Sequence, residues 1–122
     1  MKTIFLIIVS AGIFTLTSSA QTKNATIIGE VIDVVSYMTS GAKANSPDGM
    51  EILRASAAGG NPLGILEAKT GKIYLVTMRQ ANTPAKETLL QYLGQRIAAK
   101  GDVYKKGGSS VLVLTVIGKS IK

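Results

Sequence analysis

The side chains that could carry chemistry in this chain of 122 residues are hydroxyls, carboxylates and amines, because the sequence contains no cysteine, no histidine and no tryptophan. Ser36, three residues after Asp33, is a conceivable nucleophile with an acid nearby. A serine hydroxyl, however, needs an adjacent base such as histidine and an oxyanion site. Histidine is also the side chain most used for proton transfer and metal ligation near neutral pH. The composition therefore predicts a protein that is not an enzyme, in which Ser36 caps or ends an element.

The carboxylates form no pattern typical of a catalytic pair or a metal site. Glu30 and Asp33 lie three apart in an expected strand, so they point to opposite faces of the sheet. Asp33, Asp48 and Glu51 offer oxygen ligands for a hard cation such as calcium, but their spacing matches no loop motif. We therefore predict no catalytic residue, no metal and no cofactor. Four glycines also lack the strand-to-helix context of a phosphate-binding loop: Gly29, Gly59, Gly60 and Gly64.

Basic residues concentrate in the segment 96–122, in which Asp102 is the one acidic residue. Cations interleaved with an aromatic ring are the combination that OB folds use to bind anionic chains. The residues of this set predict a face for a protein or a small anionic partner: Arg96, Lys100, Tyr104, Lys105, Lys106 and Lys119. The alternative is a solvated lysine face that protects strand edges from pairing with other chains.

The first 20 residues have the three-part pattern of a secretory signal peptide. Lys2 precedes an apolar run from Ile4 to Leu16, and small residues follow up to Ala20. A membrane anchor is disfavoured, because the run is shorter than the roughly 20 residues that a spanning helix needs. We predict cleavage after Ala20, a single domain over residues 21–122 and a periplasmic or secreted location. The net charge of +7, of which cleavage removes one, favours anionic partners, and export disfavours nucleic acid among them.

Hydrophobic periodicity in the first two thirds of the chain predicts three strands and a helix. The β-branched stretch from Thr26 to Met38 predicts one long strand, bent at its glycine. The segment 50–60 predicts a short helix. Segment 61–79 predicts a hairpin that turns at Gly71, where the left-handed conformation favours glycine.

The rest of the chain predicts a helix and a second hairpin. Thr83 and Pro84 have the types expected at a helix start. Residues 95–122 predict a hairpin that turns at residues 105–108, with a last strand buried on both faces for part of its length. This order predicts a mainly β protein, a five-stranded barrel like the oligonucleotide/oligosaccharide-binding (OB) fold, with one helix between strands 3 and 4 and a short helix between strands 1 and 2. The alternative is an open α+β sandwich.

The segments "GEVIDVVSYMTSGAK", "GNPLGIL" and "TGKIYLVTM" resemble a family of small exported bacterial OB-fold proteins. In that family the first strand ends in Gly-x-Val-x-Asp-x-x-Cys-Tyr, and the next helix carries a histidine and a pair of cysteines. The resemblance covers residues 29–121 and supports the fold more than a function. Its matching positions describe mostly turns and packing: Gly29, Val31, Asp33, Tyr37, Gly41, Pro62, Gly64 and Gly71.

The departures from this family concern its cysteines and histidine. Ser36 stands where the family has its first cysteine, and Ser56 and Ile52 stand where the cysteine pair is expected. The resemblance implies that the family's residues hold a soft metal or form a redox pair. A serine hydroxyl is neutral and lacks thiolate chemistry. The resemblance therefore implies that Ser36 and Ser56 are vacated ligand positions on a retained scaffold.

These inferences favour an exported, non-catalytic binding module that docks a protein or a small anionic partner, for example as an accessory subunit of a periplasmic or cell-surface assembly. The alternative is a structural or self-associating protein, in which exposed strand edges and the apolar last strand form an oligomer or fibre. A fold does not by itself fix a function, so the OB likeness supports binding only by analogy.

Overall fold

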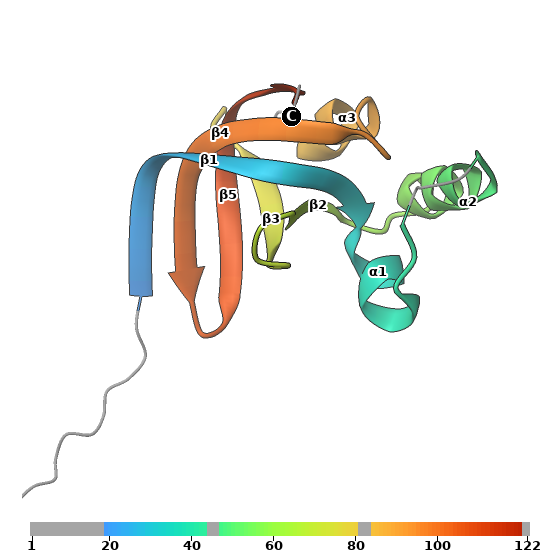
Figure 1. Cartoon of the computed structure of the whole chain (residues 1–122), viewed down its shortest axis with the longest axis horizontal. Helices are drawn as coiled ribbons and strands as arrows, with labels where there is room; N and C mark the ends of the chain where they lie inside the picture. Colours follow the sequence, from blue (N-terminus) through green and yellow to red (C-terminus); the bar gives the residue numbers. More distant parts are fainter. Residues whose placement is uncertain (1–18, 44–46, 81–83, 121–122) are drawn as a thin grey trace, which may run out of the picture.

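The computed structural model describes residues 19–43, 47–80 and 84–120 (Figure 1). Within these ranges no helix has the length and hydropathy needed to cross a membrane. Residues 1–18 of the predicted signal peptide lie outside the described residues, whereas Ser19 and Ala20 begin the first strand. The elements in chain order are β1 (Ser19–Asp33), α1 (Val34–Ser40), α2 (Pro47–Ala58), β2 (Leu63–Glu67), β3 (Ile73–Met78), α3 (Ala85–Leu90), β4 (Arg96–Lys106) and β5 (Ser109–Lys119).

The strands form one closed sheet in the order β1-β2-β3-β5-β4. The end of β1 pairs with β2, and its earlier residues pair with β4, which closes the sheet. All neighbouring strands are antiparallel except β3 and β5, which are parallel. The prediction of a mainly β protein with a closed five-stranded sheet is confirmed, and the open sandwich is excluded.

The predicted strand from Thr26 to Met38 is wrong at both ends. β1 starts earlier, at Ser19, and gives way to α1 after Asp33. The cause is the Asp33 side chain, which accepts a hydrogen bond from the Ser36 N–H at 2.9 Å and so caps the helix. This local bond outweighs the strand preference of the β-branched residues that follow it. The connection from β1 to β2 therefore holds two helices, α1 and α2, where one short helix was predicted.

Both predicted hairpins are present. The β2–β3 turn has Gly71 at φ 76°, and the β4–β5 turn has Gly107 at φ 59° and Gly108 at φ 85°. Two consecutive residues with positive φ match the two-residue turn that suits the twist of a tight hairpin. The predicted cap Thr83 lies outside the described residues, and Pro84 stands at the N-cap of α3 without a side-chain hydrogen bond.

The interior of the closed sheet is filled by aliphatic side chains from all five strands and from the helices. Leu53, Ile65, Leu89, Leu93 and Ile97 belong to this core and are each at most 1% exposed. The last strand is buried on one face only, so the prediction for both faces is wrong. Its inward residues Leu112 and Leu114 are buried, whereas Val111 and Val113 on the other face are only half-buried, because the helices contact mainly β1, β2 and β3.

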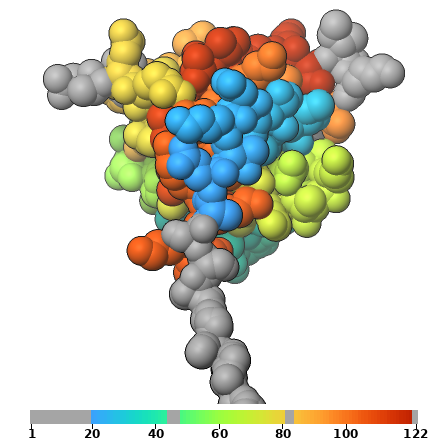
Figure 2. Space-filling view, turned by 90° about the vertical axis from the view of Figure 1, so that its left-hand side faces the viewer, coloured from blue at the N-terminus to red at the C-terminus, as the bar shows by residue number. Residues whose placement is uncertain are grey.

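Strands β1, β4 and β5 bend sharply where they leave the closed part of the sheet (Figure 1). In β1, Asn24 takes a φ of 54° and the register to β4 shifts between Thr22 and Ala25. In the β4–β5 ladder the register shifts between Lys100 and Gly101. Beyond the bend these three strands form a segment called here the arm: residues 19–22 of β1, 103–106 of β4 and 109–112 of β5. At its base, Val111 and Leu112 still pair with β3. Figure 2 shows its β1 strand in blue on the surface of the molecule.

We expect Gly101→Ala to destabilise the protein by about 3 kcal/mol or more, because a Cβ at this position would collide with the backbone carbonyl of Val113. The free energy of unfolding, measured by urea denaturation, checks this. Gly118→Ala in β5 is the matched control, since a Cβ there meets nothing within 4 Å. Equal effects of the two substitutions would show that the close approach at the bend is not what requires glycine.

A lysine-lined groove as the candidate functional site

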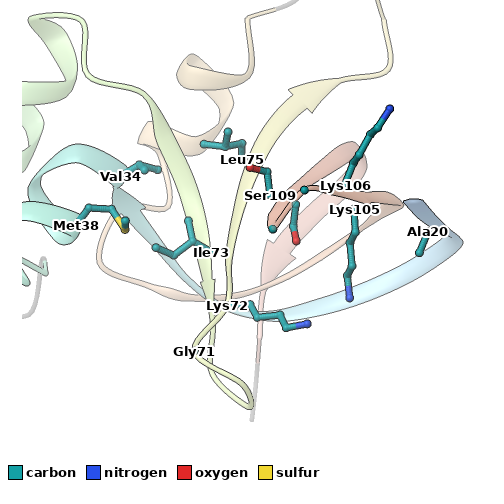
Figure 3. Close-up of a pocket in the computed structure, with 13 residues that line it drawn as sticks. Ala20, Val34, Met38, Gly71, Lys72, Ile73, Leu75, Lys105, Lys106 and Ser109 are labelled. Atoms are coloured by element: carbon teal, nitrogen blue, oxygen red, sulfur yellow. The ribbon is translucent and has the colours of Figure 1, made fainter. Parts of the chain in front are cut away.

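A groove of about 730 Å³ opens between α1, the start of β3 and the β4–β5 turn (Figure 3). Its volume lies in the range typical of ligand sites in proteins. Segments from both ends and the middle of the chain contribute to it, so closure of the sheet is what assembles it. The lining residues are Ala20, Val34, Met38, Gly71, Lys72, Ile73, Leu75, Lys105, Lys106, Gly107, Gly108, Ser109 and Ser110.

One wall of the groove is apolar. Val34 and Met38 are one helical turn apart, so they share a face of α1. Ile73 and Leu75 alternate with the buried Tyr74, which places both on the outer face of β3. Met38 is 68% and Leu75 41% exposed. These side chains form an apolar surface that faces solvent beside the groove rather than the core.

The other wall is basic. Lys105 and Lys106 come from the end of β4, and Lys72 comes from the loop before β3. Because Lys105 and Lys106 are consecutive in a strand, their side chains point in opposite directions (Figure 3), and both residues line the groove. No aspartate or glutamate is among the described residues that line the groove. Three amines with no neighbouring carboxylate in the lining create a positive potential that attracts anions.

The predicted basic set is split by the structure. Lys105 and Lys106 line the groove beside the β4–β5 turn. Arg96 and Lys119 lie at the opposite end of the same hairpin, where the Ser120 N–H bonds the Arg96 carbonyl at 2.9 Å. Lys100 lies at the bend, before the arm begins. The six residues therefore do not form a single face.

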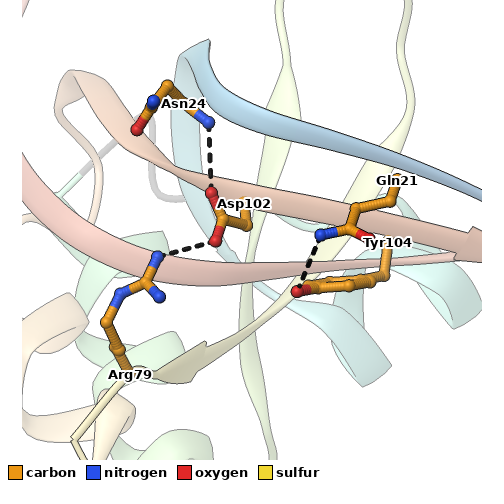
Figure 4. A network of polar contacts seen from close by, with 5 residues as sticks. All are labelled: Gln21, Asn24, Arg79, Asp102 and Tyr104. Atoms are coloured by element: carbon orange, nitrogen blue, oxygen red, sulfur yellow. Dashed lines mark hydrogen bonds and ion pairs between the residues drawn. The ribbon is translucent and has the colours of Figure 1, made fainter.

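Tyr104, predicted as a stacking ring, is not among the residues that line the groove. It is 42% exposed on the arm, and its hydroxyl accepts a hydrogen bond from the Gln21 side chain at 3.2 Å (Figure 4). Sequence analysis also missed Lys72 and the apolar wall. The pairing of β3 with β5 brings Lys72, Ile73 and Leu75 to the groove, and nothing local in the sequence signals that pairing.

The buried Asp102 carboxylate holds the base of the arm (Figure 4). One oxygen accepts the Asn24 N–H of β1 at 3.1 Å, and the other accepts Arg79 Nη2 at 2.7 Å. Because β5 lies between β3 and β4, the Arg79 side chain at the end of β3 crosses β5 to reach Asp102. The hydrogen bond from Arg79 and the bond from the Asn24 N–H lower the pKa of Asp102. The same carboxylate raises the pKa of Arg79.

A second buried carboxylate, Asp33, fixes α1 beside the groove. Besides capping α1, it accepts the Asn61 side-chain amide at 3.3 Å and 3.1 Å on its two oxygens. The Val34 N–H donates to the Pro62 carbonyl at 3.0 Å. These bonds attach the start of α1 to the segment before β2, and thereby set the position of Val34 and Met38.

Ser36 and Ser56, the predicted vacated ligand positions, lie on either side of the hydrogen bonds between Asp33 and Asn61. The Ser36 N–H bonds Asp33, and the Ser56 carbonyl accepts the Asn61 N–H at 3.2 Å. A continuous path of hydrogen bonds and short chain segments thus joins the two serines through Asp33 and Asn61. Within the described residues no three histidine, cysteine, aspartate or glutamate side chains gather as a metal site. That Ser36 and Ser56 replace ligands stays a prediction.

Comparison of the chain with models of known protein families, with curated proteins and with solved structures finds no match. The function must therefore be argued from the geometry of the groove and the arm.

We expect Asp33→Ala to lower the free energy of unfolding by about 2–3 kcal/mol, because it removes the cap of α1 and leaves the Asn61 amide without its acceptor. Urea denaturation measures the loss. Asp48→Ala, which removes an exposed carboxylate from the first turn of α2, is the control and should cost at most about 1 kcal/mol. A small effect at Asp33 would mean that α1 is held by other contacts.

The Asp102 network predicts a pH dependence of stability. Because the folded-state pKa lies below the ordinary value of 3.8, the stabilisation is complete above that value and is lost as the pH falls through the lowered pKa. Asp102→Asn should therefore be less stable than the parent protein near pH 7, and the difference should shrink near about pH 2.5. Urea denaturation at both pH values measures this, and Arg79→Gln should reproduce the trend. A difference that does not depend on pH would argue against the ion pair.

Proposed function

We propose that this protein is an exported, non-catalytic binding module that docks a protein or a small anionic partner in the lysine-lined groove. The observation that carries the proposal is the groove itself, with three lysines opposite an apolar wall and no carboxylate among its lining residues. The proposed fold is OB-like, because the strand order β1-β2-β3-β5-β4, with a helix between β3 and β4, matches that architecture. In OB folds the face of strands 2 and 3 and the loops 1–2 and 4–5 bind ligands. The groove occupies this region, which is support by analogy.

The proposed function is non-catalytic because of the side chains that the protein has. The sequence supplies no histidine and no cysteine for acid-base or nucleophilic work. The two buried carboxylates, Asp33 and Asp102, are both occupied by structural hydrogen bonds. Lysines then remain as the polar groups of the groove, together with two serine hydroxyls. Such a set binds anions and does not by itself activate a substrate.

Export by a signal peptide, also part of the proposal, has a consequence for the groove. Ser19 and Ala20 pair with Lys106 and Lys105 in β4, and Ala20 lines the groove. Cleavage after Ala20 would remove both residues and leave the two lysines without their β1 neighbours. The groove of the processed protein would therefore be wider beside its most basic wall.

Self-association through strand edges is the alternative function, and the edge of β1 opposes it. In the described residues β1 pairs with β2 only from Gly29 onward, so its earlier residues have one side open. That stretch carries the bulge at Asn24 and the exposed Lys23. A bulge and a lysine are features that keep an edge strand from pairing with another chain. The groove therefore has better support than the edge as the functional surface.

We expect the double variant Lys105→Gln, Lys106→Gln to lose at least tenfold in affinity for the partner, because it removes two of the three charges of the groove. The matched control is Lys100→Gln, Lys119→Gln, which removes the same charge from the β4–β5 hairpin outside the groove. The full-length proteins are immobilised, challenged with bacterial envelope extract and with small polyanions, and washed at low and moderate salt.

Partners retained by the parent protein and the control, but not by the groove variant, support the proposal. Binding should also weaken as the salt concentration rises, since salt screens the exposed lysines of the groove from an anionic partner. Equal retention by all three proteins, or retention by none, contradicts it.

A further inference from the structure

Parallel strands β3 and β5 stop pairing at the edge of the groove. Their register runs from Leu75 with Val111 to Met78 with Leu114. Before Leu75 and Val111 the two strands separate, and the residues on both sides of the opening, Ile73 on β3 and Ser110 on β5, line the groove. Figure 3 shows Ile73 and Ser109 on opposite sides of this opening. The groove is therefore the place where the closed sheet opens.

The opening presents a backbone donor. Lys106 and Ser109 flank the two-residue turn, and this pair exchanges hydrogen bonds in such hairpins. The next residue, Ser110, then directs its N–H away from β4 and toward β3. The Arg79 N–H donates to the Leu114 carbonyl, which confirms that even-numbered residues of β5 face β3. Because the described β3–β5 register begins one residue later, it gives the Ser110 N–H no carbonyl partner on β3.

We infer that the groove binds an extended acidic segment of a partner polypeptide that also carries apolar side chains. This inference rests on the proposed function and specifies its ligand. Each part of the segment has a counterpart in the groove. The carboxylates of the segment would pair with Lys72, Lys105 and Lys106. Its apolar side chains would pack on the wall that contains Met38 and Leu75. The backbone of an extended chain supplies the carbonyl that the Ser110 N–H lacks.

Other ligands fit fewer of these features. A small inorganic anion satisfies the lysines but leaves the exposed apolar wall in water. A fatty acid satisfies both walls but offers no backbone to the strand edge. Strand addition to an open sheet edge, with side chains on alternate positions entering pockets, is an established mode of peptide recognition. An extended chain of alternating acidic and apolar residues places one kind on each wall.

The test uses the full-length protein and a fluorescent peptide of about ten residues that alternates Glu and Val. Fluorescence anisotropy measures its affinity. A Glu–Ser peptide keeps the charge and removes the apolar side chains, and a Lys–Val peptide reverses the charge. A peptide whose valines are N-methylated keeps both kinds of side chain and removes alternate backbone donors, while its bulk blocks strand pairing. Inorganic phosphate and decanoate are added as competitors.

We expect the Glu–Val peptide to bind at least roughly tenfold more tightly than each of the three altered peptides. Lys105→Gln, Lys106→Gln should weaken it about tenfold, and Lys100→Gln, Lys119→Gln less than twofold. Leu75→Ser, on the exposed apolar wall, should reduce the difference in affinity between the Glu–Val and Glu–Ser peptides. Circular dichroism and thermal unfolding verify that the variants are folded.

Three results would overturn the inference. Phosphate or decanoate binding at the groove lysines without peptide binding leaves the proposed function intact and makes the ligand a small anion or an amphiphile. Equal binding of the N-methylated peptide rules out the strand edge. Binding of none of the probes, together with failure of the envelope-extract experiment, removes the proposed function as well.

Discussion

The bend at the base of the arm is the constraint on which the rest of the structure depends. Five strands close into one sheet here, and the three long ones, β1, β4 and β5, all bend sharply (Figure 1). Gly101 permits the backbones of β4 and β5 to approach, and the bulge at Asn24 lets β1 follow them. Asp102 then joins the bent β1 to the end of β3 through Asn24 and Arg79. A single carboxylate thus fixes the angle at which the arm leaves the sheet.

The two walls of the groove are held by two different buried carboxylates. Asp102 holds the base of the arm, which carries Lys105 and Lys106 at its tip. Asp33 holds α1, which carries Val34 and Met38. Buried carboxylates are costly unless hydrogen bonds satisfy them, and each of these has at least two donors. Their presence in a small core is therefore best explained by what they position, since apolar residues could fill the same space without that cost.

Local patterns in the sequence predicted the hairpins and most of the closed sheet, because glycines at Gly71, Gly107 and Gly108 mark the turns unambiguously. They failed at α1, where β-branched residues follow Asp33 and only the side-chain cap decides between helix and strand. They also failed before Thr26, where the strand was predicted to start, because Gln21, Thr22 and Ala25 have little strand pattern and yet pair with β4. The ion pair of Arg79 with Asp102 joins residues 23 positions apart and has no local signature. For the groove, two lysines were predicted, whereas Lys72 and the apolar wall depend on long-range pairing.

The position of the groove follows from how the sheet closes. A closed sheet has no open edge where all its strands pair, but β3 is only six residues long and β5 is 11. The longer strand must continue past the shorter one, so the sheet opens where they part. In the described residues this opening lies beside the arm, whose tip projects two lysines, and beside α1, which leaves Met38 exposed. A ligand that pairs with β5 before Val111 would continue the sheet at the point where β3 no longer pairs with β5. Pairing of β3 with β5 beyond Leu75 would therefore close the opening on which the groove depends.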